Sequence, residues 1–259
     1  MRYQTPHNVE HAAFPQFSDN WALFLDVDGT LLELAGRPHD VSLPAGLADV
    51  LESLFQQVPL ALISGRRIAD LDRLFASLVL PVAGQHGAER RSSDGRTCQR
   101  PVSRVDLEPA RDILTHWAGS HPGVLLEDKG LTLALHYRLV PELKAEAAQV
   151  ARQAACLLRA DYEIIPGNMV WEVRPVGCDK GRAIAAFLDE TPFCDRIPVF
   201  IGDDVGDEDG FSLLNSRGGH SFKVGAGQTA ARSRFSDVGD VLNWLHDYAA
   251  WLASASQRA

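Results

Sequence analysis

The chain has 259 residues, of which 46% are hydrophobic, so it is large enough for one domain that carries a smaller inserted one. Its 25 Lys and Arg residues against 34 Asp and Glu residues give a formal net charge of −9. This balance excludes a broad surface for nucleic acids or anionic membranes, so an anionic ligand needs local cations or a metal ion. The four cysteines form no CxxC pair, and residues 1–20 contain no apolar stretch typical of a signal peptide. We therefore expect a cytoplasmic protein that binds neither nucleic acids nor membranes, and we expect it to be a monomer.

The first predicted element is a buried strand at residues 22–25, an apolar run that ends abruptly in acidic side chains. Asp26 and Asp28 follow it, and Gly29 then indicates a turn. The two carboxylates, or one carboxylate and a nearby carbonyl, can converge on one point. A simpler interpretation is a turn in which the aspartates cap backbone amides. A calcium loop of the EF-hand type is excluded, because its final position would be Arg37 instead of glutamate.

Helix and strand patterns then alternate, which is typical of a parallel sheet with helices on both faces. The predicted elements are helix 44–58, strand 59–63, helix 67–78 and strand 81–84. The alternation resumes after residue 177 with helix 179–189, strand 198–201, helix 208–215, strand 221–224 and helix 238–254. We therefore predict an α/β fold with a Rossmann-like core that comprises residues 1–86 and 178–259.

The segment between these two halves has a different pattern. Helices are predicted at 108–120 and 141–159, and residues 131–138 and 169–174 alternate between apolar and polar side chains. The apolar stripe of helix 141–159 can cover one face of a small antiparallel sheet and leave the other face polar. Residues 87–177 are therefore predicted to form an α+β cap inserted into the core.

A second acidic cluster ends the predicted strand at residues 198–201. Ligands of open parallel sheets bind beyond the carboxyl ends of the strands, where the strand order reverses. Asp203 can therefore meet Asp26 and Asp28 in one crevice, although it lies far from them in sequence. Three carboxylates repel each other unless a cation lies between them, and oxygen ligands with room for water and phosphate suit Mg²⁺.

Two further residues are placed to bind a phosphate at the same edge of the sheet. Ser64 follows the predicted strand 59–63, so its hydroxyl group and the next amides can face an anion. Lys180 lies at the start of a predicted helix, whose free N–H groups also favour an anion. By position alone, Lys180 would be a solvated lysine of a first helical turn. The order of four motifs along the chain, DxDGT, SGR, DKG and GDDxxDE, favours a phosphate site instead.

These motifs resemble those of the haloacid-dehalogenase-like hydrolase superfamily. The resemblance implies that Asp26 attacks phosphorus to form an aspartyl phosphate and that Asp28 is the general acid and base, with Lys180 as a third catalytic residue. The implied Mg²⁺ ligands are Asp26, the main-chain carbonyl of Asp28, and Asp203. The implied phosphate contacts are Thr30, Ser64, Gly65 and Lys180. The implied residues that support the metal site are Asp204 and Asp207, although Asp207 can instead cap the next helix.

Asp28 also distinguishes between reactions of that superfamily. A halide leaves without a proton, whereas an alkoxide needs one, so an acid two residues after the nucleophile favours hydrolysis of a phosphate ester. The cap would decide which ester. Its segments LEDKGLTLALHYR (126–138) and VWEVRPVGCDKG (170–181), together with GQHGAE (84–89), resemble trehalose-6-phosphate phosphatases.

This second resemblance covers nearly the whole chain and implies a set of substrate contacts. The implied contacts are Arg66, Glu127, Lys129, Arg138, Asn168 and Glu172. Many relatives carry a lysine where this chain has Asn168, which puts substrate affinity in question more than the reaction type. Gln85 and Gly206 also depart from the usual residues, without touching the expected chemistry, and His86 is interpreted as structural.

The residues themselves agree with a sugar ligand. Glu127 and Lys129 share one face of a strand, and acids and bases paired in this way can exchange many hydrogen bonds with a polyhydroxylated sugar. A solvated sheet face with surface ion pairs is the alternative interpretation. We therefore expect a Mg²⁺-dependent phosphatase that converts trehalose 6-phosphate to trehalose and phosphate. The rivals are a phosphatase for another sugar or polyol phosphate and a catalytically silent domain that binds a sugar phosphate.

Overall fold

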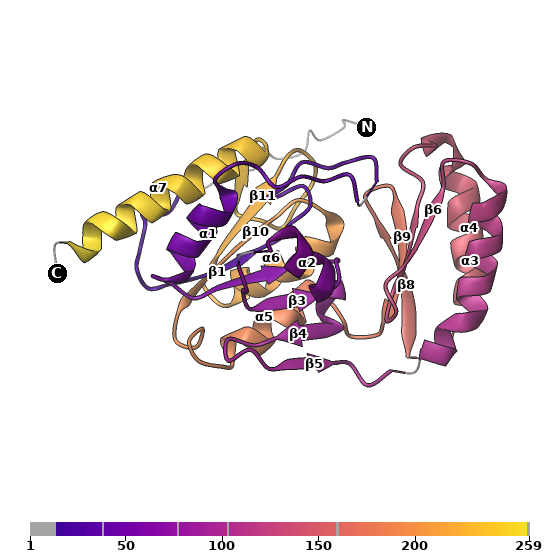
Figure 1. Ribbon diagram of the computed structural model, residues 1–259, viewed down its shortest axis with the longest axis horizontal. Coiled ribbons are helices and arrows are strands. Elements are labelled where there is room, and N and C mark those ends of the chain that lie inside the picture. The colour runs from indigo at the N-terminus through magenta and orange to yellow at the C-terminus, as the bar shows by residue number, and fades with distance from the viewer. Residues whose placement is uncertain (1–13, 38, 77, 103, 159–160, 258–259) are drawn as a thin grey trace, which may run out of the picture.

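Two lobes lie side by side in the computed structural model, which describes residues 14–257 except 38, 77, 103, 159 and 160 (Figure 1). The larger lobe, here called the core, is built on a sheet of eight strands, and the smaller lobe, the cap, is built on a sheet of four. The outer ends of the expected core, 1–13 and 258–259, lie outside the described residues, as does the last residue of the expected helix 141–159.

The core sheet has the strand order β12–β11–β10–β1–β2–β3–β4–β5. Its strands are β1 (Trp21–Leu25), β2 (Leu60–Ile63), β3 (Val82–Gly84), β4 (Glu89–Arg91), β5 (Thr97–Gln99), β10 (Ile197–Gly202), β11 (His220–Val224) and β12 (Ser233–Phe235). Neighbouring strands from β12 to β3 are parallel, whereas β4 and β5 are antiparallel additions at one edge. The predicted α/β fold with a parallel core is therefore confirmed.

The strand order reverses at the centre of this sheet, where β1 lies beside β10 and Leu25 pairs with Ile201. From β1 the chain continues through β2 and β3 to one side, and from β10 it continues through β11 and β12 to the other. Ligand crevices form beyond the strands at such a point. Asp26 directly follows β1 and Asp203 follows β10, so the fold brings both carboxylates to this crevice.

Helices cover both faces of the core sheet. On one face lie α1 (Leu47–Phe55), α2 (Ile68–Leu74) and α7 (Val238–Ser256), and on the other lie α5 (Lys180–Leu188) and α6 (Glu208–Ser216). Helix α7 packs on the first face through one apolar stripe, since Val241, Leu245 and Leu252 are spaced to lie on one side of the helix and are buried there. The two helix layers hold β1 and β10 in place and so fix the position of the crevice beyond their carboxyl ends.

The cap has an antiparallel sheet in the order β6–β7–β9–β8, with helices on its side away from the core (Figure 1). Its elements are α3 (Glu108–Ser120), β6 (Leu125–Asp128), β7 (Leu133–His136), α4 (Lys144–Ala155), β8 (Tyr162–Gly167) and β9 (Val170–Pro175). Leu133, Leu135 and Val173 pack under the helices. Alternation along the strands turns Glu127, His136 and other polar residues to the opposite face, toward the core.

The structure differs from the expected cap boundaries at one end. Strands β4 and β5 lie within the expected cap, residues 87–177, but they extend the core sheet beyond β3. The hairpin forms there because the edge of β3 offers unpaired backbone groups to the strand that follows. We propose that the inserted module begins after Gln99.

Several predicted elements have different bounds in the structure. The expected helix 44–58 begins only at Leu47, because Gly46 before it has a left-handed backbone with φ of 80°. The expected strand 169–174 begins at Val170, because Met169 lies in the β8–β9 turn with φ of 58°. The expected helix 141–159 starts with a 3-10 turn and ends as an α-helix at Ala155. None of the described helices is both long and apolar enough to span a membrane.

Candidate active site

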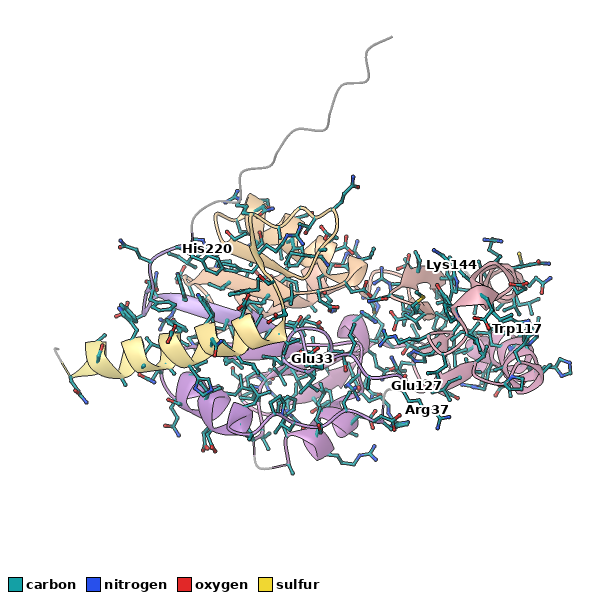
Figure 2. All side chains as sticks on the ribbon, turned by 90° about the horizontal axis from the view of Figure 1, so that it is seen from above. Glu33, Arg37, Trp117, Glu127, Lys144 and His220 are labelled. Atoms are coloured by element: carbon teal, nitrogen blue, oxygen red, sulfur yellow. The ribbon has the colours of Figure 1, made fainter. Side chains whose placement is uncertain are left out.

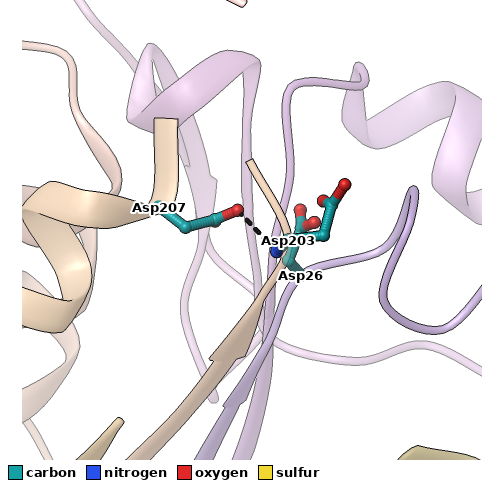
Figure 3. Close-up of side chains that lie close together, drawn as sticks. All are labelled: Asp26, Asp203 and Asp207. Carbon is teal, nitrogen blue, oxygen red and sulfur yellow. Dashed lines mark hydrogen bonds between the residues drawn. The ribbon is translucent and has the colours of Figure 1, made fainter. Parts of the chain in front are cut away.

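Three carboxylates meet at the carboxyl ends of the central strands (Figure 3). Asp26, Asp203 and Asp207 each offer an oxygen within 4.8 Å of the others. Gly29 makes room for this arrangement, because a Cβ on it would lie 2.2 Å from Oδ2 of Asp203. The fold therefore brings together the two side chains expected to bind Mg²⁺, Asp26 and Asp203, with Asp207 beside them.

Lys180 is the cation of this cluster. Its Nζ donates hydrogen bonds to Oδ1 of Asp26 at 2.8 Å and to Oδ1 of Asp207 at 2.6 Å, and all three side chains are buried. Burial opposes the charge of the amine, but the two carboxylates raise the pKa of Lys180 well above its ordinary value. The simpler interpretation of Lys180 as a solvated lysine is wrong, because only 4% of its surface is exposed.

Asp207 uses both of its carboxylate oxygens within the protein. Oδ1 accepts from Lys180 at 2.6 Å. Oδ2 accepts from the main-chain N–H of Asp203 at 3.0 Å (Figure 3) and from that of Asp204 at 2.9 Å. The Asp204 carboxylate in turn accepts from the N–H of Val205. Asp207 thus orients Asp203 and Lys180. It also completes a capping box with Asp204, the N-cap of the 3-10 helix Val205–Asp207, but its side chain forms no cap hydrogen bond to α6.

The carboxylates carry more negative charge than one lysine offsets. Burial raises the pKa of Asp26 well above its ordinary value, and the charges of Asp207 and Asp203 raise it further despite the attraction of Lys180. Burial and the neighbouring Asp207 likewise raise the pKa of Asp203 to about 7. A divalent cation would relieve this repulsion, and oxygen donors are the ligands that Mg²⁺ prefers. The residues present therefore fit Mg²⁺.

The second aspartate of the first motif has a different partner from the first. Asp28 is bound by Arg66 through two hydrogen bonds, from Nε to Oδ2 at 2.7 Å and from Nη2 to Oδ1 at 2.6 Å. Arg66, expected among the substrate contacts, thus gives its guanidinium group to the expected general acid in this structure. A planar bidentate pair of this kind fixes the orientation of the carboxylate.

Thr30 and Ser64, two of the expected phosphate contacts, lie just beyond the carboxyl ends of β1 and β2. Thr30 Oγ1 donates to Oδ2 of Asp26 at 3.2 Å, and both residues are buried. Ser64 is also buried and accepts from the N–H of Arg66 at 3.1 Å, which shapes the turn through Gly65. These positions agree with a phosphate held at the end of β1 and β2.

Polar residues of the cap face this group across one cleft. The cleft is lined by Asp26, Asp28 and Lys180 of the core and by Glu127, Lys129 and Glu172 of the cap. Figure 2 shows Glu127 of the cap near Arg37 of a core loop, where the two lobes meet, and both residues line the cleft. Cap and core side chains are therefore in position to contact the same ligand.

The cap residues form a chain of charged contacts. Nε2 of His136 lies 3.0 Å from Oε2 of Glu127, and Nζ of Lys129 lies 3.7 Å from Glu127 and 3.6 Å from Glu172. Burial opposes ionisation of Glu127, but the hydrogen bond from His136 and the charge of Lys129 lower its pKa to about 2. The four side chains are only 7 to 21% exposed, so the alternative of a solvated sheet face does not describe them.

Three of the expected substrate contacts, Lys129, Arg138 and Asn168, form hydrogen bonds that join the cap to the core. Lys129 Nζ donates to the carbonyl of Gly65, and Arg138 Nη1 donates to the carbonyl of Ala35, both at 2.9 Å. The N–H of Asn168 donates to the Asp204 carboxylate at 3.0 Å. Asn168 therefore joins the lobes through its main chain, whatever side chain the position carries.

Some residues of the cleft were not expected from the sequence. The loop that carries Leu34, Ala35 and Arg37 lines it, as do His86 and His136. A sequence signal existed for His136, which shares a strand face with Arg138. Arg37 and its neighbours carry no motif, because they reach the cleft only through the contact between the lobes.

Comparison with known proteins gives consistent results. A family model described as trehalose-phosphatase matches residues 24–238. A probable trehalose-phosphate phosphatase of Sinorhizobium fredii is 44% identical over 80% of this chain and 78% of its own, and the trehalose-6-phosphate phosphatase of Escherichia coli is 41% identical over 89% and 87%. The C-terminal domain of the Candida albicans trehalose-6-phosphate phosphatase is similar in fold, with a TM-score of 0.81 and 22% identity over 90% of this chain and 93% of that one.

Proposed function

The chain belongs to the trehalose-phosphatase family, and from this premise we propose that it hydrolyses trehalose 6-phosphate to trehalose and phosphate. One observation carries the proposal: the buried pair of Asp26 and Lys180 opens into a cleft whose other wall is the polar face of the cap. A nucleophile with its phosphate-binding cation thus faces groups suited to sugar hydroxyls.

In the proposed first half-reaction, an oxygen of Asp26 forms a bond to phosphorus while the bond between phosphorus and the sugar oxygen breaks. Asp28 gives its proton to the leaving oxygen. In the second half-reaction, Asp28 takes a proton from water, whose oxygen bonds to phosphorus as the bond to Asp26 breaks. Phosphate leaves, and the carboxylate of Asp26 is restored.

The other core residues bind and orient in this scheme. Lys180 holds Asp26 and would neutralise an oxygen of the phosphoryl group, and Thr30, Ser64 and the amide of Gly65 would bind its other oxygens. Asp26, the main-chain carbonyl of Asp28, and Asp203 would hold Mg²⁺, with Asp204 and Asp207 as supporting residues. When bound, Mg²⁺ supplies positive charge that lets a carboxylate approach a phosphate dianion.

The cap would provide specificity for the sugar. We propose that Glu127, Lys129 and Glu172 exchange hydrogen bonds with hydroxyl groups of the disaccharide and that Arg138 and Asn168 close the same end of the cleft. Closure would exclude bulk water during transfer of the phosphoryl group. Arg66 would act mainly through Asp28, to which it is bound.

Release of phosphate from purified protein tests the proposal. Trehalose 6-phosphate is compared with glucose 6-phosphate, a polyol phosphate and p-nitrophenyl phosphate, each with Mg²⁺ and with excess EDTA. We expect the highest kcat/KM on trehalose 6-phosphate and loss of activity in EDTA. Preference for another ester would support the rival sugar or polyol phosphatase, and no release from any ester would support a silent binding domain.

A further inference from the structure

A turn of unusual backbone conformation lies beside the candidate active site. Gln85, His86 and Gly87 follow β3 with φ values of 49°, 58° and 94°. Residues other than glycine adopt such values rarely and at an energetic cost, and conformations of this kind gather at functional sites, where the surrounding structure enforces them. The first two residues of the turn are almost completely buried. The turn therefore calls for a functional explanation.

On the core side, this turn is bonded to the loop expected to bind phosphate. The N–H of Gln85 donates to the carbonyl of Arg66 at 2.9 Å, and the N–H of His86 donates to the carbonyl of Ser64 at 3.0 Å. The imidazole ring also packs against Gly65, where an added Cβ would lie 2.9 Å from Nε2 of His86. Any displacement of the turn is therefore transmitted to the phosphate loop.

On the other side, the same turn contacts the cap. Nε2 of His86 lies 2.9 Å from Oε2 of Glu172, and Oγ1 of Thr132 donates to the Gln85 side chain at 2.9 Å. Although this distance to Glu172 is short, neither ring nitrogen of His86 has a hydrogen-bond partner among the described residues. Buried polar atoms without partners are rare and require a reason.

Glu172 lies between an imidazole and an amine that come from different lobes. His86 approaches Oε2 from the core, and Lys129 of the cap lies 3.6 Å from Oε1. Burial opposes ionisation of Glu172, but His86 and Lys129 hold its pKa well below its ordinary value. Glu172 is therefore an anion whose orientation depends on a core residue.

We propose that His86 is a positioning residue for substrate recognition: from the core, it orients the Glu172 carboxylate toward the sugar. This inference rests on the proposed function. The turn from Gln85 to Gly87 then has two roles. It positions the loop expected to bind phosphate, and it positions the Glu172 carboxylate that would bind the sugar. His86 itself acts only through Glu172.

Three substitutions distinguish the contribution of the His86 ring to substrate recognition from that of the backbone at this position. His86→Ala removes the ring. His86→Asn keeps a side chain that tolerates the left-handed backbone but is too short to reach Glu172. His86→Gln places an amide nitrogen close to the former Nε2 position, and Gln85 next to it already adopts a left-handed backbone. Each variant is compared with wild type on trehalose 6-phosphate and on p-nitrophenyl phosphate, and its thermal unfolding is measured.

We expect the Ala and Asn variants to raise KM for trehalose 6-phosphate by about 10- to 100-fold, since they remove the imidazole whose Nε2 lies 2.9 Å from the Glu172 carboxylate. His86→Gln should restore KM to within about threefold of wild type. kcat/KM for p-nitrophenyl phosphate should change by less than about twofold in all three, because that substrate has no sugar for Glu172 to bind.

Three results would overturn the inference. If KM is raised in His86→Ala but equals the wild-type value in His86→Asn, the rise of KM comes from the backbone alone and not from loss of the ring. Equal losses on both substrates would show that His86 merely supports the phosphate loop, and loss in His86→Gln equal to that in His86→Ala would exclude a polar role of the ring. If wild type hydrolyses p-nitrophenyl phosphate but not trehalose 6-phosphate, the proposed function itself fails. If wild type hydrolyses both, any of the three results above overturns only the role of His86.

Discussion

Gly29 offers a direct test of the metal site, because its missing side chain is what makes room for Asp203. An added Cβ would lie 2.2 Å from Oδ2 and 2.3 Å from Cγ of Asp203, and the φ of Gly29 is +81°. Gly29→Ala therefore has two separable effects. One is the backbone strain of an L-residue at positive φ, and the other is a collision with a carboxylate expected to bind Mg²⁺.

The two effects have different sizes and different readouts. Positive φ costs about 1–2 kcal/mol for a non-glycine residue. For a chain of this length, that corresponds to a fall in Tm of about 2–8 °C. Ordinary contact begins at 3.4 Å, so the carboxylate must move by about 1.2 Å, the difference between 3.4 and 2.2 Å. Misplacement of a catalytic group by about 1 Å costs roughly 100-fold in rate.

Gly46→Ala is the matched control. Gly46 precedes α1 with a φ of +80°, and an added Cβ would meet no atom within 4 Å. It carries the same backbone strain without a collision. We expect similar losses of Tm in both variants. Only Gly29→Ala should lower kcat/KM by about 100-fold and require more Mg²⁺ for half-maximal activity, while Gly46→Ala should stay within about twofold of wild type.

The assay is a Mg²⁺ titration of the hydrolysis of p-nitrophenyl phosphate, with thermal unfolding in EDTA as the measure of stability. A Gly29→Ala variant with the activity and Mg²⁺ requirement of Gly46→Ala would refute the assignment of Asp203 as a metal ligand. A larger loss of Tm in Gly29→Ala would show that the collision also strains the fold.

Three further predictions concern the catalytic pairs and the cap. Asp26→Asn should lower turnover by at least about 10³-fold without lowering Tm in EDTA, and near-normal turnover would remove Asp26 from the role of nucleophile. Arg66→Gln should slow hydrolysis of trehalose 6-phosphate about tenfold more than that of p-nitrophenyl phosphate, because only the poor leaving group needs Asp28 as an acid; equal losses would contradict this. The pKa of Glu127, about 2 in the folded protein, is below its ordinary 4.5, so its stabilisation is present above pH 4.5 and is lost as pH falls through 2. Urea unfolding should show that wild type loses up to about 3 kcal/mol more than Glu127→Gln between pH 5 and 2, whereas parallel declines would exclude this role of Glu127.

The parts of the fold that follow from local patterns could be predicted from the sequence. The apolar run before Asp26 and the alternation of helices and strands indicate a parallel sheet, since these signals depend on periodicity along the chain. The meeting of Asp26 and Asp203 follows from one further rule, that parallel strands present their carboxyl ends at the same edge. Lys180 was assigned through the order of the four motifs along the chain, because its position at the start of a helix alone favours a solvated lysine.

The rest depends on tertiary contacts that no local pattern encodes. Strands β4 and β5 read as part of the cap because an antiparallel hairpin looks the same wherever it pairs. Arg66 was expected to contact substrate, but the choice between a ligand and Asp28 depends on where the neighbouring loop lies. The strained turn at His86 is not evident from the sequence, because Gly87 is the one residue of the three that adopts a positive φ readily.

The two crossings between the lobes also have a consequence for how such enzymes diversify. Nη2 of Arg100, on the outgoing crossing, donates to the carbonyl of Val176, on the returning one, at 3.2 Å. A segment whose ends are neighbours adds little loop-closure entropy to the folding of the rest. Its replacement by a foreign module of similar end spacing would leave the central sheet continuous. Exchange of the cap at these two crossings would therefore change the groups that contact the substrate and leave in place the strands that carry Asp26 and Asp203.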